Sequence, residues 1–257
     1  MKLLNNQFDL EDFYRRLSSA NERLLMLDYD GTLAPFTTER DHALPYPEIA
    51  VTLKRLYGSD RTRVVIISGR TVDALKKLLD SDDLPELWGC HGLERHTSDG
   101  QYWIVELPDD MRQKLSELYN WTAEENLVNF CEFKPSGGAF HWRGLPPDEA
   151  ELIRDKVNAR WHDVAQTSDL ELLAFDGGVE IRVAGTNKAN PVDQLLVEAN
   201  DDTVLAYLGD DQTDEDAFRA LKGRGLGVLV RGEIRDTLAD LWLEPPDELK
   251  AFLERWL

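Results

Sequence analysis

The alternation of apolar and polar positions predicts two kinds of element along most of this chain. Short, mainly apolar runs are typical of strands buried on both faces, and segments with helical apolar spacing lie between them. This alternation indicates a parallel sheet with helices on both faces, so we expect an α/β fold with a doubly wound, Rossmann-like sheet. The expected strands are 24–27, 63–67, 87–90, 203–208 and 226–230, and the expected helices are 8–20, 47–57, 71–79, 191–199 and 214–221.

The middle of the chain has a different order of elements. Two strands follow one helix, and two more strands follow a second helix, which favours a small antiparallel sheet. Gly137–Gly138 and Asp176–Gly177–Gly178 suit hairpin turns between these strands. We predict an α+β domain at 106–182, inserted into a core formed by 1–105 and 183–257. Its expected helices are 109–124 and 147–161, and its expected strands are 128–133, 139–143, 171–175 and 179–183.

Two aspartates follow the first expected strand of the core. In an open parallel sheet, ligands bind at the carboxyl ends of the strands. Asp28 and Asp30 lie at such an end, within the sequence DYDGT. Carboxylates two residues apart can share a divalent cation, while one attacks phosphorus and the other transfers a proton. The alternative is an ordinary acidic turn, because Asp-Gly is a common turn pair.

Two further motifs supply groups that suit a phosphate. Ser68-Gly69-Arg70 follows the next strand, where a hydroxyl and backbone N–H groups can hold phosphate oxygens. Ser68 can equally cap the helix that follows. Lys188, before the expected helix at 191–199, would neutralise both a nucleophile and a transferring phosphoryl group. Alone it is uninformative, since most lysines are solvated surface charges.

An acidic cluster follows the strand at 203–208. Oxygen ligands beside a strand end suit Mg²⁺, which takes one or two carboxylates and keeps several waters. The alternative is a set of acidic residues favoured by a helix dipole, and this accounts for Glu215 and Asp216. The remaining carboxylates, which are candidates for metal binding, are Asp210, Asp211 and Asp214.

Together and in this order, these motifs resemble the haloacid dehalogenase superfamily of phosphohydrolases, over residues 24–93 and 183–230. The resemblance implies that Asp28 is the nucleophile and Asp30 the general acid/base. It also implies a Mg²⁺ ion held by Asp28, the backbone carbonyl of Asp30 and Asp210, with Asp211 or Asp214 in support. The implied phosphate-binding residues are Ser68, Gly69, Arg70 and Lys188.

A narrower resemblance, to the trehalose-6-phosphate phosphatase family, rests on GDDQTDEDAF at 209–218, CHG at 90–92, and the motifs ExK, HxR and EIR…NK. This chain has Ala189 after Lys188 where the family usually has glycine, which we interpret as a local change of turn. The family places a cap domain where the insertion lies, and a cap selects the leaving group. The alternative for these residues is a salt-bridged, solvated face. The implied sugar-binding residues are Glu132, Lys134, Ser136, His141, Arg143, Glu180 and Asn187.

The composition narrows the classes of partner. With 29 basic and 49 acidic residues the net charge is −20, which disfavours nucleic acid and anionic membranes. The apolar runs are too short to cross a bilayer, and the first residues do not resemble a signal peptide. Two cysteines exclude a disulfide scaffold in practice. We expect a cytoplasmic protein with a small sugar-phosphate substrate; a monomer is favoured, although the sequence does not give the oligomeric state.

The leading hypothesis is a Mg²⁺-dependent phosphomonoesterase that acts on a disaccharide or glycoside phosphate through an aspartyl-phosphate intermediate. Trehalose 6-phosphate is the best single substrate on the resemblance. One alternative is another glycoside phosphate, such as glucosylglycerol phosphate or a glycosyl-phosphoglycerate. Another is a non-catalytic phosphosugar-binding regulatory domain, which would not need the nucleophile Asp28. A response-regulator receiver is a weaker alternative, because it lacks a cap and a pair of aspartates like Asp28 and Asp30.

Overall fold

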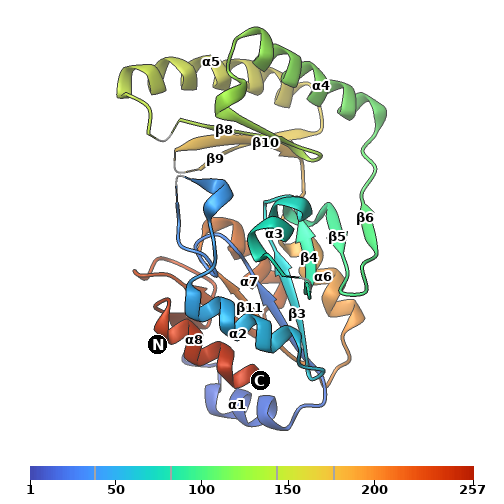
Figure 1. Ribbon diagram of the computed structural model, residues 1–257, viewed down its shortest axis with the longest axis vertical. Helices are drawn as coiled ribbons and strands as arrows, with labels where there is room; N and C mark the ends of the chain where they lie inside the picture. The colour runs from blue at the N-terminus through green and yellow to red at the C-terminus, as the bar shows by residue number, and fades with distance from the viewer. Residues whose placement is uncertain (38, 82, 143, 176) are drawn as a thin grey trace. The chain divides into compact units, whose positions relative to one another are not determined.

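The computed structural model describes the whole chain except Thr38, Asp82, Arg143 and Asp176, and the side chain of Arg40. Backbone contacts divide the chain into two compact units. The first comprises Met1–Ile104 and Asn187–Leu257, and the second comprises Val105–Thr186, drawn mainly in green to yellow in Figure 1. The division into a core and a substrate-selecting cap with the boundaries given above stays a prediction. Among the described residues, every helix is too short or too polar to span a membrane.

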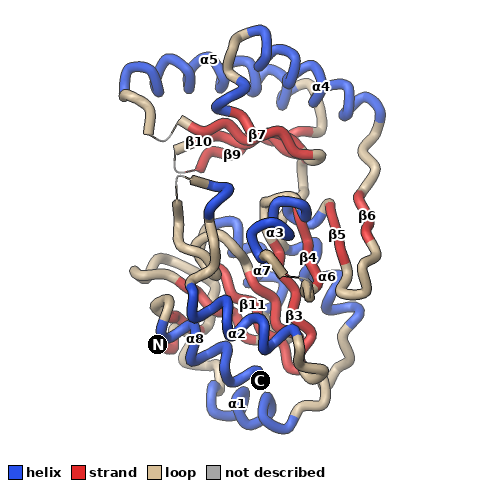
Figure 2. The backbone as a smooth tube through the Cα atoms, viewed as in Figure 1, coloured by secondary structure: helices blue, strands red, loops and turns tan. Residues whose placement is uncertain are grey.

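The first unit is built on a sheet of nine strands within the described residues, in the order β1-β13-β12-β11-β2-β3-β4-β5-β6. The pairs from β13 through β4 are parallel, whereas β1, β5 and β6 pair antiparallel at the two edges. Figure 2 shows these strands in red between helices. The strands are β1 (Lys2–Leu3), β2 (Arg23–Leu27), β3 (Thr62–Ile67), β4 (Glu86–Gly89), β5 (Glu94–His96), β6 (Tyr102–Ile104), β11 (Val204–Gly209), β12 (Leu226–Val230) and β13 (Leu241–Leu243).

Side chains of successive strand residues enter two separate cores, because they alternate between the faces of a sheet. Leu25 and Leu27 pack with α1, α2, α3 and α8, whereas Leu24 and Met26 pack with α6 and α7. The predicted doubly wound α/β fold is therefore confirmed. The helices are α1 (Leu10–Ser19), α2 (Pro47–Tyr57), α3 (Val72–Leu79), α6 (Ala189–Glu198), α7 (Glu215–Leu221) and α8 (Asp247–Leu253).

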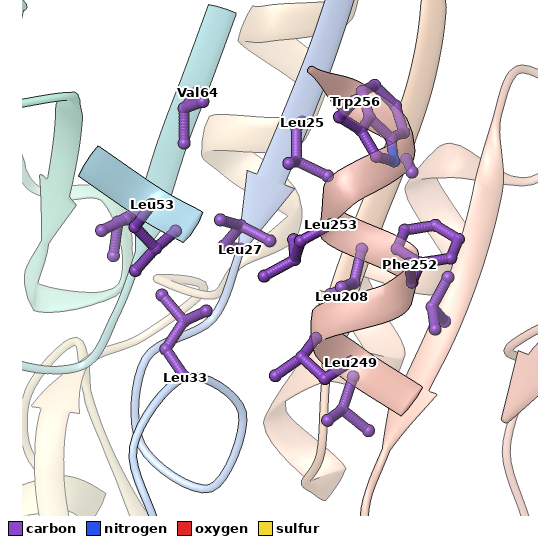
Figure 3. Close-up of a cluster of buried hydrophobic side chains, with 14 of the residues drawn as sticks. Leu25, Leu27, Leu33, Leu53, Val64, Leu208, Leu249, Phe252, Leu253 and Trp256 are labelled. Atoms are coloured by element: carbon purple, nitrogen blue, oxygen red, sulfur yellow. The ribbon is translucent and has the colours of Figure 1, made fainter. Parts of the chain in front are cut away.

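The central strand β2 anchors the fold and the start of the site. All five of its residues are buried, and the continuous apolar run at 24–27 predicts this for the four after Arg23. Figure 3 shows Phe252, Leu253 and Trp256 of the C-terminal segment packed beside Leu25 and Leu27 of this strand. Each fully buried side chain of this size contributes roughly 1.5–3 kcal/mol. The residues that follow β2 therefore start from a strand end held firmly on both faces.

The second unit has an antiparallel sheet covered by helices. Its strand order is β7-β8-β10-β9, with β7 (Cys131–Lys134), β8 (Gly137–His141), β9 (Leu170–Phe175) and β10 (Gly178–Val183). The helices are α4 (Asp109–Glu124) and α5 (Pro147–Gln166). Phe140 of β8 stacks edge-on with Trp161 of α5 at a ring distance of 6.1 Å, in a separate apolar core. An α+β unit inserted in the chain is what the element order predicts.

Two local expectations in the second unit are wrong. The strand expected at 128–133 begins only at Cys131, because Val128–Phe130 form a 3-10 helix. The turn expected at Gly137–Gly138 lies instead at Pro135 and Ser136, and Gly137 opens β8. A Cβ on Gly137 would lie 1.9 Å from the carbonyl oxygen of Ile181, so this glycine permits close approach of β10 rather than a turn.

Candidate active site

The candidate site forms where three neighbouring parallel strands end. Asp28 follows β2, and its backbone N–H donates to the Leu208 carbonyl of β11 at 2.8 Å. Asp210 directly follows β11, and Ser68 directly follows β3 on the other side of β2. The DYDGT motif, Ser68-Gly69-Arg70 and the acidic cluster after β11 therefore meet at one edge of the sheet, as expected for an open parallel sheet.

Lys188 joins two of the aspartates. It lies just before α6, and its Nζ donates to Asp28 Oδ1 at 2.6 Å and to Asp214 Oδ1 at 2.7 Å. The three side chains are between 0 and 5% exposed, so these ion pairs are almost fully shielded from water. The Thr32 hydroxyl donates to the other oxygen of Asp28 at 3.2 Å. Asp28 is thus held through both carboxylate oxygens.

Asp214 and Asp210 have opposite surroundings. Asp214 accepts from Lys188 and the Tyr207 hydroxyl on Oδ1, and from two backbone N–H groups on Oδ2. A carboxylate has about four lone-pair sites, so the described donors occupy all of them. Both oxygens of Asp210 are buried and have no hydrogen-bond partner among the described residues. A buried carboxylate without a donor is costly, so Asp210 is suited to a ligand that brings positive charge.

Gly31 gives Asp210 its place. Its backbone lies in the left-handed region, with φ +84°, and a Cβ there would lie 2.3 Å from Asp210 Oδ2. Any side chain would therefore be strained and would displace the carboxylate. The glycine of the sequence DYDGT is required both for the turn and for the approach of the neighbouring loop.

Burial and crowding of the carboxylates shift their pKa values strongly. Burial raises the pKa of Asp28 to about 7, and Asp214 adds to the rise while Lys188 opposes it. Burial also raises the pKa of Asp210 to about 10, with further rises from Asp28 and Asp214. Burial alone would lower the pKa of Lys188, but Asp214 and Asp28 more than offset this, so its pKa is raised and it stays charged.

The acidic trio fits a hard cation. One carboxylate oxygen from each of Asp28, Asp210 and Asp214 lies within 4.8 Å of the others. Mg²⁺ binds through one or two carboxylates, and Asp28 and Asp210 are the two whose surroundings leave room for it. Asp211 lies outside the trio: its exposed carboxylate accepts from the Gln212 N–H at 2.6 Å and caps the short 3-10 helix Gln212–Asp214.

Asp30 contacts the segment after β3 that holds the expected phosphate-binding residues Ser68, Gly69 and Arg70. Arg70 holds Asp30 through two hydrogen bonds of 2.7 Å, from Nε and from one terminal nitrogen. Ser68 is 1% exposed, and its hydroxyl oxygen accepts from the Arg70 N–H at 3.2 Å. The His91 ring packs against Gly69, where a Cβ would lie 2.6 Å from Nε2. The structure thus places Arg70 on Asp30, the expected proton-transfer group.

Four of the expected sugar-binding residues share one part of the second unit. Glu132 and Glu180 both lie opposite Ala139 of β8, so they occupy one row across the sheet. Lys134 Nζ bonds to Glu180 Oε1 at 3.1 Å, with both side chains largely buried. His141 on β8 contacts the Phe175 ring, 5.2 Å between centroids.

Two of the other three expected sugar-binding residues lie elsewhere. Ser136 is buried in the β7–β8 turn. Asn187 belongs to the first unit, where its side-chain oxygen accepts from the Ala189 N–H at 2.9 Å. Arg143 lies outside the described residues.

Tyr207 and Arg235, which the sequence motifs did not indicate, support the site. The Tyr207 hydroxyl donates to Asp214 Oδ1 at 2.6 Å. Arg235 donates to the carbonyls of Asp210 and Asp211, at 3.2 and 2.6 Å, and so ties down the acidic loop. A tyrosine within a buried apolar strand needs a hydrogen-bond partner for its hydroxyl, and on this ground the sequence could have indicated a polar contact for Tyr207. Nothing in the local sequence indicates Arg235, which reaches the loop from 25 residues away.

A doubly wound core with aspartates at these strand ends is similar to that of haloacid dehalogenase-like hydrolases. A haloacid dehalogenase-like hydrolase from Bacteroides thetaiotaomicron matches with a TM-score of 0.62 over 92% of this chain and all of that one, at 15% identity, which shows the shared fold. Residues 26–235 match the model of the trehalose-phosphatase family. The chain belongs to that family.

Similar proteins include both phosphatases and a larger synthase. The trehalose-6-phosphate phosphatase of Aspergillus fumigatus is 26% identical, with a TM-score of 0.67 over 97% of both chains. The alpha,alpha-trehalose-phosphate synthase [UDP-forming] B of Dictyostelium discoideum is 30% identical over 96% of this chain. This chain spans 31% of that relative's length, so the relative contains much that this sequence does not match.

The pKa values predict how stability changes with pH in the absence of metal. Because the pKa values of about 7 for Asp28 and 10 for Asp210 exceed the value of roughly 3.9 for an unfolded aspartate, the folded protein holds more protons. Raising the pH from about 5 to 8 should therefore lower the free energy of unfolding. Asp210→Asn should weaken this dependence, and exposed Asp202→Asn should not.

Thermal unfolding in EDTA across this pH range measures the effect for all three proteins. Adding Mg²⁺ should stabilise the parent protein at pH 8, because an ion that binds only the folded state shifts the equilibrium toward it. A wild-type stability that stays constant or rises between pH 5 and 8 would contradict the assignment of a crowded carboxylate site.

Proposed function

We propose that this chain is a Mg²⁺-dependent phosphomonoesterase that converts trehalose 6-phosphate and water to trehalose and phosphate. The observation that carries the proposal is the buried Asp210 carboxylate, which has no donor among the described residues and lies beside the Asp28–Lys188 pair. A nucleophile, a fixed positive charge and a place for a cation are what phosphoryl transfer to a carboxylate requires. Membership of the trehalose-phosphatase family supports the choice of substrate.

The proposed reaction has two steps. In the first, a carboxylate oxygen of Asp28 attacks phosphorus, the bond from phosphorus to the sugar oxygen breaks, and Asp30 gives its proton to that oxygen. In the second, Asp30 takes a proton from water, which attacks the phosphorus of the aspartyl phosphate. Phosphate leaves and the Asp28 carboxylate is restored. Lys188 and Ser68 hold the phosphate oxygens through both steps.

Asp28, Asp210 and the backbone carbonyl of Asp30 would hold the Mg²⁺ ion. When bound, Mg²⁺ offsets the repulsion between the attacking carboxylate and the anionic phosphate. The pKa of about 7 for Asp28 in the metal-free protein means that burial disfavours the ionised form that must attack. A nearby cation and Lys188 both favour that ionised form.

Arg70 has two competing partners in this proposal. It pairs with Asp30 in the structure, and a phosphate at Ser68 would compete for the same guanidinium. Transfer of Arg70 to the phosphate would release the Asp30 carboxyl from these two hydrogen bonds, so that it can face the leaving-group oxygen. Phosphate binding would thereby prepare the general acid.

Phosphate release from a panel of esters tests the proposed activity. The panel comprises trehalose 6-phosphate, glucosylglycerol phosphate, glucose 6-phosphate and p-nitrophenyl phosphate, each assayed with Mg²⁺ and with EDTA. We expect the highest kcat/KM for trehalose 6-phosphate, and loss of all activity in EDTA. Full activity in EDTA would refute the metal requirement, and preference for another ester would refute the substrate.

Asp28→Asn should abolish turnover while the protein stays folded. An amide is a poor nucleophile and a poor Mg²⁺ ligand, so a loss on the order of 10³-fold or more in kcat is expected. Exposed Asp202→Asn is the matched control and should keep parental activity. Activity of Asp28→Asn within tenfold of the parent would remove Asp28 from the role of nucleophile.

The residues of the second unit should affect the natural substrate and a small ester differently. We propose that Glu132, Glu180 and Arg143 bind the sugar, so that their replacement by Ala should lower kcat/KM for trehalose 6-phosphate but not for p-nitrophenyl phosphate. Each lost charged hydrogen bond should cost roughly 1.5–3 kcal/mol, or about ten- to a hundredfold in specificity.

Glu151→Ala, on the exposed face of α5, is the control for the loss of a carboxylate from the same unit. Thermal unfolding of each variant separates loss of binding from loss of folding, since removal of Glu180 also leaves Lys134 without that ion pair. Parallel losses on both substrates would show that these residues are structural.

A further inference from the structure

Tyr207 combines complete burial with a polar contact at the site. It is 0% exposed within β11, and its ring packs edge-on against Phe218 of α7 at 5.6 Å between centroids. Its hydroxyl donates to Asp214 Oδ1 at 2.6 Å. A short hydrogen bond to a carboxylate is stronger than one between neutral groups, so this contact strongly restrains Asp214.

Asp214 in turn positions Lys188 through a hydrogen bond. The same oxygen that accepts from Tyr207 also accepts from Lys188 at 2.7 Å, while Oδ2 is fixed by the N–H groups of Asp210 and Asp211. Lys188 has its other contact with Asp28, at 2.6 Å. The chain of contacts therefore runs from Tyr207 through Asp214 and Lys188 to the proposed nucleophile.

We propose that Tyr207 is a positioning residue for phosphoryl transfer, which acts through Asp214 to keep Lys188 beside Asp28. With its hydroxyl in place, Asp214 Oδ1 is shared between two donors and Lys188 divides its charge between two carboxylates. Without it, Oδ1 has Lys188 as its one described donor, and the ammonium moves toward Asp214 and away from Asp28. The kinetic consequence rests on the proposed function, whereas the structural consequence does not.

Tyr207→Phe tests the proposal, because phenylalanine keeps the ring on Phe218 and removes the hydroxyl alone. Loss of a group that orients a residue at the reacting centre typically costs about 10–100-fold, so kcat should fall by that factor. KM should change little, and the factor should be equal for trehalose 6-phosphate and p-nitrophenyl phosphate, because Tyr207 belongs to the core unit.

Tyr57→Phe is the matched control. The Tyr57 hydroxyl is also buried, but it has no hydrogen-bond partner among the described residues, so its removal should leave kcat unchanged. If Tyr207→Phe lowers thermal stability but keeps parental kcat, its hydroxyl has a structural role and the proposal is wrong.

A crystal structure of Tyr207→Phe decides the question without reference to turnover. We expect Lys188 Nζ to leave hydrogen-bonding distance of Asp28 Oδ1, and the Asp214 carboxylate to turn. An unchanged arrangement of Asp28, Lys188 and Asp214 would overturn the proposal even if activity falls. Should the parent protein hydrolyse no phosphate ester with Mg²⁺, the proposed function fails, and the crystal structure still tests the positioning role.

Discussion

Three carboxylates buried around one lysine are the constraint that the rest of this structure satisfies. Asp28, Asp210 and Asp214 are each at most 3% exposed, and Lys188 is the one ammonium that contacts them among the described residues. Such a cluster is costly in a folded protein, since repulsion and lost hydration are offset by a single cation. The parallel strands β2 and β11 hold two of these aspartates at adjacent ends and supply the rigidity that keeps them together.

The hydrogen bonds divide this cluster into parts with different tasks. Asp214 is saturated by donors and organises Lys188, whereas Asp210 lacks donors among the described residues and is left for a ligand. Arg235 donates hydrogen bonds to the backbone carbonyls of Asp210 and Asp211, and the absence of a side chain on Gly31 leaves room for the Asp210 carboxylate. In the proposed function, Asp210 would hold the metal and Asp214 positions Lys188, so two aspartates of one short motif have separate tasks.

Much of the core was predictable because its signals are local. Buried parallel strands such as β2 and β12 are continuous apolar runs, and the aspartates that follow them lie at the sheet edge by topology alone. The edge strands β5 and β6 and the terminal helix α8 were not predicted, because short, partly exposed elements are specified by tertiary packing. The turn predicted at Gly137–Gly138 was wrong for a related reason. Glycine is required at 137 because the backbone of Ile181, which is distant in sequence, lies close to it.

In the site, too, local motifs were predictable from the sequence, whereas contacts between distant residues were not. Asp28, Lys188 and Asp210 come from recognisable motifs, but the sequence left Asp211 and Asp214 equivalent. The capping contact of Asp211 and the four donors on Asp214 separate them. Glu132 and Glu180, two of the proposed sugar-binding residues, share a row across the second sheet that follows from strand register. Their pairing partners, unlike the aspartate motifs, are not encoded by adjacent residues.

Chemical trapping of the intermediate tests the central claim, that Asp28 attacks phosphorus, most directly. Borohydride reduces an acyl phosphate to an alcohol, so quenching the protein during turnover of trehalose 6-phosphate with Mg²⁺ should convert Asp28 to homoserine. Mass spectrometry of the peptide that contains Asp28 would detect the change, which should be absent without substrate. An unmodified Asp28 during demonstrated turnover, or homoserine at another aspartate, would contradict the account.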